Sequence, residues 1–209
     1  MLDVPCGDMQ WMSRFLETRD DIIYTGFDIV PDLIERHQQT YADRPWTFRN
    51  VDIAIDSSFV NNFDLIITRH MLQHLDNAAV FRILSKLSGE TIHPSFLLAS
   101  TFSRMSKNFE IDVHMRGRCR FLNLELDPFR LEPPICLLHD GPSGPNYLGL
   151  WRLPLMTLPE SYCRRNNLSL TVKSASLCLP SKSAETNANS LLAAKIYSCS
   201  SWKLPNVSH

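Results

Sequence analysis

The N-terminal stretch constrains the fold most, because it predicts a strand, a tight turn and a helix in immediate succession. Leu2 and Val4 supply a short apolar run, which ends at Gly7. Apolar residues at helical spacing follow between Trp11 and Leu16. A strand that enters a helix through such a turn leaves backbone N–H groups directed at any ligand above the sheet. The turn by itself is compatible with a ligand loop and with an ordinary connection.

An acidic residue after the second predicted strand favours the ligand loop. Asp28 ends the β-rich run from Ile22 and lies 21 positions after Gly7 (28 − 7). Nucleotide-binding α/β folds place a carboxylate on a ribose hydroxyl at about this spacing.

Strand and helix patterns alternate along the next part of the chain. Further strands are expected over 46–51, 65–67 and 96–100, and helices over 32–41 and 76–87. This alternation predicts right-handed βαβ units and a parallel sheet. Residues 101–130 have no sustained period and suggest an extended or partly helical segment near the mouth of the site, and 135–139 and 147–151 read as two strands around a turn.

Four segments follow one another in an order that indicates a family. They are Asp3 to Asp8, Gly26 to Pro31, Asn50 to Ile53 and Phe63 to Leu75. In this order they resemble the successive motifs of class I S-adenosylmethionine-dependent methyltransferases, and residues 120–124, 128–129 and 148–153 are similar to the second half of a poorly characterised subgroup.

The resemblance implies an α/β fold with a doubly wound, mostly parallel sheet of the seven-stranded type and helices on both faces. The two strands over 135–151 would then form an antiparallel pair at one edge of the sheet. We expect a methyltransferase domain over residues 1–153 and an irregular, loosely attached tail over 154–209, where serine, alanine and asparagine are frequent.

The resemblance also implies a cofactor, S-adenosylmethionine, and residues that bind it. Asp28 would accept hydrogen bonds from the ribose hydroxyls, Ile29 would lie against the adenine face, and Asp52 with Ile53 would face the adenine edge. The first motif and the segment after the fourth strand would supply the remaining contacts: Asp3, Cys6, Gly7, Asp8, Trp11, Thr68 and Arg69. In the alternative interpretation none of these residues binds a cofactor. Asp3 is then an acid at the end of a strand, Gly7 precedes an ordinary helix, and Asp28 and Asp52 are solvated acids in turns.

Two histidines are candidates for accepting a proton from the methyl acceptor. His70 and His74 follow the fourth predicted strand, where open α/β sheets place catalytic groups, and imidazole titrates near neutral pH. The alternative for His74 is that it only packs beside Leu75. Arg116, Arg118 and Arg120 could hold an acidic acceptor, although closely spaced arginines more often form a solvated face.

The chain departs from the family pattern at its start. Pro5 and Met9 stand where the family has glycines, and the chain begins at the first strand itself, so we expect the fold to be incomplete at the N-terminus. A catalytically inactive remnant is therefore an alternative function. A nicotinamide-dependent dehydrogenase is a second alternative, but it requires a G-x-G-x-x-G turn that residues 5–10 lack.

Composition narrows the remaining classes. A chain of 209 residues is long enough to form one domain with a hydrophobic core. Its 21 basic and 22 acidic residues nearly balance, so the net charge does not indicate a nucleic-acid or membrane partner. Six cysteines without a CxxC pair fit reduced thiols, and no signal peptide or membrane span is visible, so we expect a cytoplasmic protein. The Cys and His spacing fits no zinc site. We expect a small-molecule acceptor, whose identity stays open together with the oligomeric state.

Overall fold

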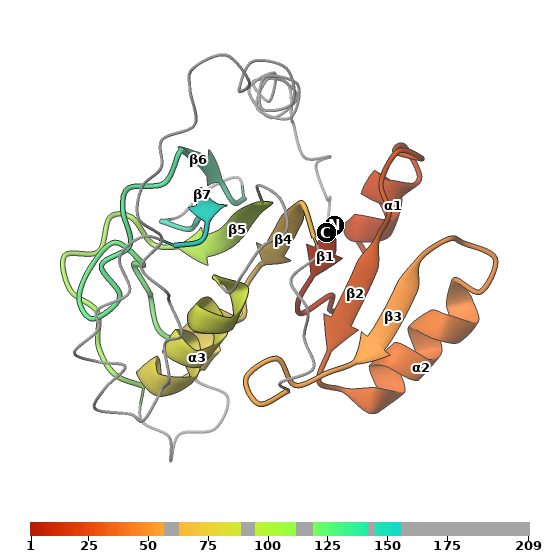
Figure 1. The fold of residues 1–209 in the computed structure, drawn as a ribbon, viewed down its shortest axis with the longest axis horizontal. Helices are drawn as coiled ribbons and strands as arrows, with labels where there is room; N and C mark the ends of the chain where they lie inside the picture. Colours follow the sequence, from red (N-terminus) through yellow and green to blue (C-terminus); the bar gives the residue numbers. More distant parts are fainter. Residues whose placement is uncertain (57–62, 89–94, 112–118, 142–144, 156–209) are drawn as a thin grey trace, which may run out of the picture. The chain divides into compact units, whose positions relative to one another are not determined.

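The computed structural model describes residues 1–56, 63–88, 95–111, 119–141 and 145–155. These residues contain a seven-stranded sheet with the order β3-β2-β1-β4-β5-β7-β6 (Figure 1). The strands are β1 (Leu2–Asp3), β2 (Thr25–Asp28), β3 (Thr47–Asn50), β4 (Leu65–Thr68), β5 (Ser95–Thr101), β6 (Cys136–His139) and β7 (Tyr147–Leu153). The predicted tail lies outside the described residues apart from 154 and 155.

The sheet is mixed, as the sequence predicted. Strands β1 to β5 pair in parallel with their neighbours, whereas β7 pairs antiparallel with both β5 and β6. The family resemblance had placed an antiparallel pair at one edge, and this expectation is confirmed.

Four helical elements connect the strands in the described part of the chain: α1 (Met12–Leu16), α2 (Pro31–Thr40), the 3₁₀ helix η1 (Leu72–His74) and α3 (Asn77–Leu87). The expected helix over 76–87 begins one residue later, because the Asp76 carboxylate accepts the N–H of Ala79 and so caps the first turn. Pro31 occupies the first turn of α2, where its missing N–H costs nothing.

Two apolar clusters show that helices cover both faces of the sheet. Leu2, Ile66 and Leu97 pack on one face with buried residues of α3, such as Leu84. Tyr24 and Phe48 pack on the other face with Met12 and Leu16 of α1 and Ile34 of α2. The predicted doubly wound arrangement is therefore confirmed.

The segment after β5 agrees with the extended alternative of the expectation rather than with the partly helical one. Its described residues, 102–111 and 119–131, form turns and extended chain with no helix or strand; we call these residues the cap segment. Side chains, rather than a neighbouring strand, satisfy the backbone groups of this segment. Asn108 donates to the carbonyls of Asn123 and Asp127 and accepts from the Asn123 N–H.

The strand order reverses between β1 and β4, which are neighbours in the sheet. Connections from these two strands lead to opposite faces, so a crevice opens at their carboxyl ends, where ligands bind in open α/β folds. Among the described residues, no helix is long and apolar enough to cross a membrane.

Candidate functional site

The carboxyl ends of β1 and β2 are joined through the side chain of Asp28. Its Oδ2 accepts the N–H of Gly7 at 3.1 Å, and its Oδ1 accepts the N–H of Val30 at 3.1 Å. The residue is only 6% exposed. Each carboxylate oxygen keeps a lone pair beyond these bonds, so Asp28 is fixed in place and can still accept from a ligand hydroxyl.

The turn after β1 is shaped around Gly7. This residue has a φ of +54°, which glycine adopts at little cost. Its carbonyl accepts a hydrogen bond from Nε2 of the buried His37 at 2.6 Å, which fixes the proton of that ring on Nε2. The turn is therefore held from α2 as well as from β2.

Two titratable side chains of the first motif, those of Asp3 and Cys6, are buried beneath this turn. Burial raises the pKa of Asp3 to about 7, although the hydroxyl of Tyr24 donates to its Oδ2 at 3.2 Å and Arg69 lies near enough to oppose the rise. Burial, together with the charges of Asp28 and Asp3, raises the pKa of Cys6 to about 12. Cys6 therefore remains a thiol with no nucleophilic role.

The outer wall of the turn is formed by Trp11 and Asp8. Trp11 is 37% exposed, and the guanidinium of Arg69 lies over its ring, 5.3 Å from the centroid. Asp8 is exposed and accepts the N–H of Gln10. A cation from the end of β4 thus reaches the start of α1 across the crevice.

The residues expected at the adenine end occupy different environments. Ile29 is 61% exposed, as a residue that covers a flat ligand would be, whereas Ile53 is 4% exposed and packs in the core. Asp52 is half-buried and its Oδ1 accepts the N–H of Ala54.

The end of β4 carries an unusual hydroxyl. Thr68 is fully buried, and its Oγ1 has no hydrogen-bond partner in the described part of the chain. A buried hydroxyl without a partner is costly and often marks a place that a ligand or water completes.

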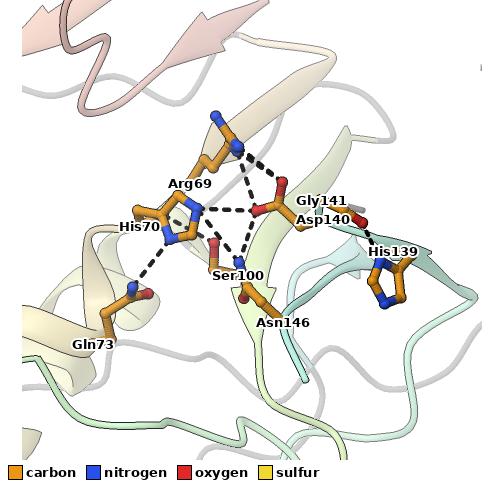
Figure 2. Close-up of polar contacts among 8 residues, drawn as sticks. All are labelled: Arg69, His70, Gln73, Ser100, His139, Asp140, Gly141 and Asn146. Atoms are coloured by element: carbon orange, nitrogen blue, oxygen red, sulfur yellow. Dashed lines mark hydrogen bonds and ion pairs between the residues drawn. The ribbon is translucent and has the colours of Figure 1, made fainter. Parts of the chain in front are cut away.

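Arg69 and His70, which follow Thr68, converge on the carboxylate of Asp140 after β6 (Figure 2). Arg69 donates to it from Nε and from Nη2, the latter at 2.9 Å, and Nε2 of His70 lies 3.1 Å from Oδ2. Asn146, just before β7, donates to the same Oδ2 at 2.9 Å. The Asp140 side chain is only 2% exposed, so three groups neutralise or satisfy one buried carboxylate.

The ring of His70 is engaged at both nitrogens. Gln73 lies 3.1 Å from Nδ1, opposite the contact with Asp140. A neutral ring that donates from Nε2 and accepts at Nδ1 satisfies both neighbours, and partial burial lowers the pKa of His70 against the opposing pull of Asp140. The backbone of His70 has a φ of 56°, and its N–H donates to the Ser100 hydroxyl.

His74 differs from His70 in this respect. It ends η1, and its exposed side chain makes no hydrogen bond with the described residues. Its exposed ring is accessible to an acceptor, and the alternative in which His74 only packs beside Leu75 stays a prediction.

Asp140, Asn146 and Gln73 were missed by the sequence analysis. Residues 140 and 69 are 71 positions apart, and residues 146 and 70 are 76 apart. The sequence marks Asp140 only as a turn former, so no local pattern could have joined it to Arg69. Among the described residues, no group of three His, Cys, Asp or Glu side chains could hold a metal ion.

Arg120 also differs from the expectation of a solvated arginine. Its side chain is 8% exposed and donates to the carbonyls of Leu75 and Phe109. These contacts engage its donors within the protein rather than with an acidic acceptor. Arg116 and Arg118 lie outside the described residues.

Comparisons with known proteins agree with this architecture. Residues 2–89 match a family model described as a methyltransferase domain. A search of curated proteins gave no match.

Several solved structures share the fold. A 1,6-didemethyltoxoflavin-N1-methyltransferase of Burkholderia thailandensis is 17% identical with a TM-score of 0.55, over 73% of this chain and 69% of that one. A protein of Pyrococcus horikoshii is 16% identical with a TM-score of 0.52, over 73% of this chain and 80% of that one. The chain spans only 37% of another match, the [4+2]-cyclase SpnF, at 18% identity and a TM-score of 0.41 over 47% of its own length.

The first 89 residues thus have the sequence pattern of a methyltransferase domain, and the sheet has the Rossmann-like fold of the S-adenosylmethionine-dependent methyltransferases. The family resemblance predicted from the four motifs is confirmed.

Proposed function

From the premise of a methyltransferase domain on this fold, we propose that the chain transfers a methyl group from S-adenosylmethionine to a small-molecule acceptor. The observation that carries the proposal is the carboxylate of Asp28, buried at the end of β2 and fixed by the N–H groups of Gly7 and Val30. A fixed carboxylate with free lone pairs suits the two neighbouring hydroxyls of a ribose.

The other residues around the crevice fit the remaining parts of the cofactor. Ile29 offers an exposed apolar side chain to the adenine ring, and Asp52 keeps Oδ2 for its amino group. Arg69 lies over the Trp11 ring and uses Nε and Nη2 on Asp140, so that Nη1 would be left for the carboxylate of the methionine part. The unpartnered hydroxyl of Thr68 lies at the end of the adjacent strand.

Two relatives with the same fold support this ligand. The Burkholderia thailandensis methyltransferase was solved with S-adenosylhomocysteine, and so was PigF, which is 16% identical with a TM-score of 0.53. The first of these proteins also held its small-molecule acceptor, 1,6-didemethyltoxoflavin.

The cofactor, when bound, supplies an activated methyl group on a sulfonium. An in-line displacement needs no covalent nucleophile from the protein. The remaining tasks of the protein are to align the acceptor and to remove its proton. We assign the role of proton acceptor to His74, whose ring is exposed and unpaired among the described residues. His70 is assigned a positioning role, because Asp140 and Gln73 engage its two nitrogens.

The thiols support a reducing compartment for this activity. Cys6, Cys119 and Cys136 are unpaired in the described part of the chain. We therefore keep the cytoplasm as the proposed location.

Calorimetry with three ligands tests the proposal. The protein should bind S-adenosylmethionine and S-adenosylhomocysteine, and NAD should give no signal under the same conditions. Binding of NAD alone would replace the proposal with the dehydrogenase alternative. Binding of S-adenosylmethionine without any methyl transfer would assign the chain to inactive cofactor-binding forms.

A labelled methyl group separates the two histidines. We expect His74→Ala to lower transfer from S-adenosylmethionine into a low-molecular-weight cell extract by about 100-fold, with S-adenosylhomocysteine affinity unchanged. His70→Ala should instead weaken S-adenosylhomocysteine, because it loosens the group that fixes Arg69. Full transfer activity in His74→Ala would remove that residue from the mechanism.

A further inference from the structure

The cap segment presents an aromatic ring that the cofactor site does not use. Phe121 is 52% exposed, although it lies between Arg120 and the buried Leu122. We propose that the Phe121 ring is a stacking platform for the methyl acceptor, and that the acceptor is a planar aromatic or heteroaromatic compound. This inference rests on the proposed methyltransferase function and names the acceptor class.

A backbone hydrogen bond joins the segment that carries Phe121 to the segment that carries the proposed base. The N–H of Arg120 donates to the carbonyl of Gln73 at 3.1 Å. Phe121 and His74 are the next residues after this bonded pair, so their backbones lie close together. Gln73 in turn contacts His70, which follows the carboxyl end of β4.

The ring also lies at the carboxyl end of β5. Phe102 directly follows that strand, and its ring centroid is 4.8 Å from that of Phe121. The N–H of Phe102 donates to the carbonyl of Leu122 at 3.0 Å. Phe102 is 5% exposed and backs one part of the Phe121 ring, while the remainder of that ring faces outward. The carboxyl ends of β4 and β5 are where an acceptor must approach the cofactor in this fold.

The platform is held in place without a ligand. The buried side chain of Arg120 donates to the carbonyl of Leu75 at 2.7 Å, and the N–H of Leu124 donates to the hydroxyl of Thr101 at 3.2 Å. Asn108 fixes the Asn123 backbone from the other side. A ring ordered before binding loses little entropy when an acceptor stacks on it, so the contact adds directly to affinity.

The surrounding charges favour an uncharged ring over an anion. Arg120, the nearest cation in sequence, directs its guanidinium to backbone carbonyls and to Glu110. An exposed aromatic face beside a base therefore suits a flat ring that carries a hydroxyl or an N–H group. Stacking supplies the orientation, and His74 accepts the proton.

A matched pair of probes tests the platform: 2-naphthol, which is planar, and decahydro-2-naphthol, which has the same carbon skeleton without aromatic rings. Binding is measured by ligand-observed NMR on protein saturated with S-adenosylhomocysteine. We expect 2-naphthol to bind about tenfold more tightly than the saturated probe, and Phe121→Ala to remove this preference. Phe121→Tyr should keep it, because the ring remains.

Ile23→Ala is the matched control, since Ile23 is an exposed apolar residue at 84% exposure that precedes the amino end of β2. It should leave the preference unchanged. Equal binding of the two probes, or an undiminished preference in Phe121→Ala, overturns the platform while leaving the methyltransferase proposal intact. Failure of the parent protein to bind S-adenosylhomocysteine would overturn the proposed function first.

Discussion

Asp28 and Gly7, 21 residues apart, are joined by a hydrogen bond from the Gly7 N–H to the Asp28 carboxylate at 3.1 Å. This bond ties the turn after β1 to the end of β2. The turn and the acid to which we assign the nucleoside contacts in the proposed function are therefore positioned by one another. A substitution at either residue should therefore disturb both the turn and the position of the carboxylate.

Replacing Asp28 by Ala should weaken S-adenosylhomocysteine by about 2 kcal/mol or more, because a charge-assisted partner of two hydroxyls is removed and the turn is released. Calorimetry of the variant measures the change. Asp20→Ala, at an exposed acid before β2, serves as the control and should bind like the parent. Parental affinity in Asp28→Ala would withdraw the site assignment.

Two arginine–aspartate pairs of different burial should differ in their effect on stability. Asp140→Asn replaces a carboxylate that is 2% exposed and bonded to Arg69. We therefore expect the free energy of unfolding in urea to fall by about 2 kcal/mol. Asp127→Asn breaks the pair with Arg130, whose side chains are 72% and 66% exposed. This variant should leave the unfolding midpoint unchanged, because solvent screens an exposed pair. Equal losses in the two variants would contradict the burial argument.

Stability should fall as the pH rises toward neutrality because of Asp3. Burial raises the pKa of this residue to about 7 in the folded protein, from an ordinary value of 3.8. The folded state therefore holds a proton that the unfolded state has released, and the associated stability is present below pH 3.8 and is lost as the pH rises through about 7.

The variant Asp3→Asn should flatten this profile, since the amide oxygen still accepts from Tyr24 but cannot ionise. Urea unfolding at about pH 5 and about pH 8 measures the difference, which we expect to be on the order of 3 kcal/mol in the parent and much smaller in the variant. Equal slopes in the two proteins would show that other groups govern the pH dependence.

Gly149 in β7 has no room for a side chain. A Cβ at this position would lie 2.3 Å from the ring of Trp151, which is buried and donates from Nε1 to the Glu132 carbonyl. We expect Gly149→Ala to destabilise the protein by about 2 kcal/mol in urea unfolding. In a Trp151→Leu background, Gly149→Ala should cost less than it does in the parent, because the clash is removed. Strictly additive losses would show that the two residues do not interact.

The sequence by itself determined the fold class and the order of the motifs to which we assign the nucleoside contacts. The signals for strands, turns and helices are local in the sequence. Gly7 and Asp28 are separated by one helix and one strand, and this strand–helix–strand unit is the one from which an α/β fold is built. The bounds of most elements moved by only one or two residues, as with α3, where Asp76 caps the helix rather than joining it.

Only the tertiary structure decided how the mouth of the site is built. Asp140 meets Arg69 across 71 residues because β7 returns antiparallel beside β5 and brings the end of β6 close to the end of β4. The same folding engages the two nitrogens of His70, leaves His74 exposed, and turns Arg120 inward while Phe121 points out. Local propensity cannot specify such contacts, since they depend on which strand edges pair and on which side chains the pairing buries.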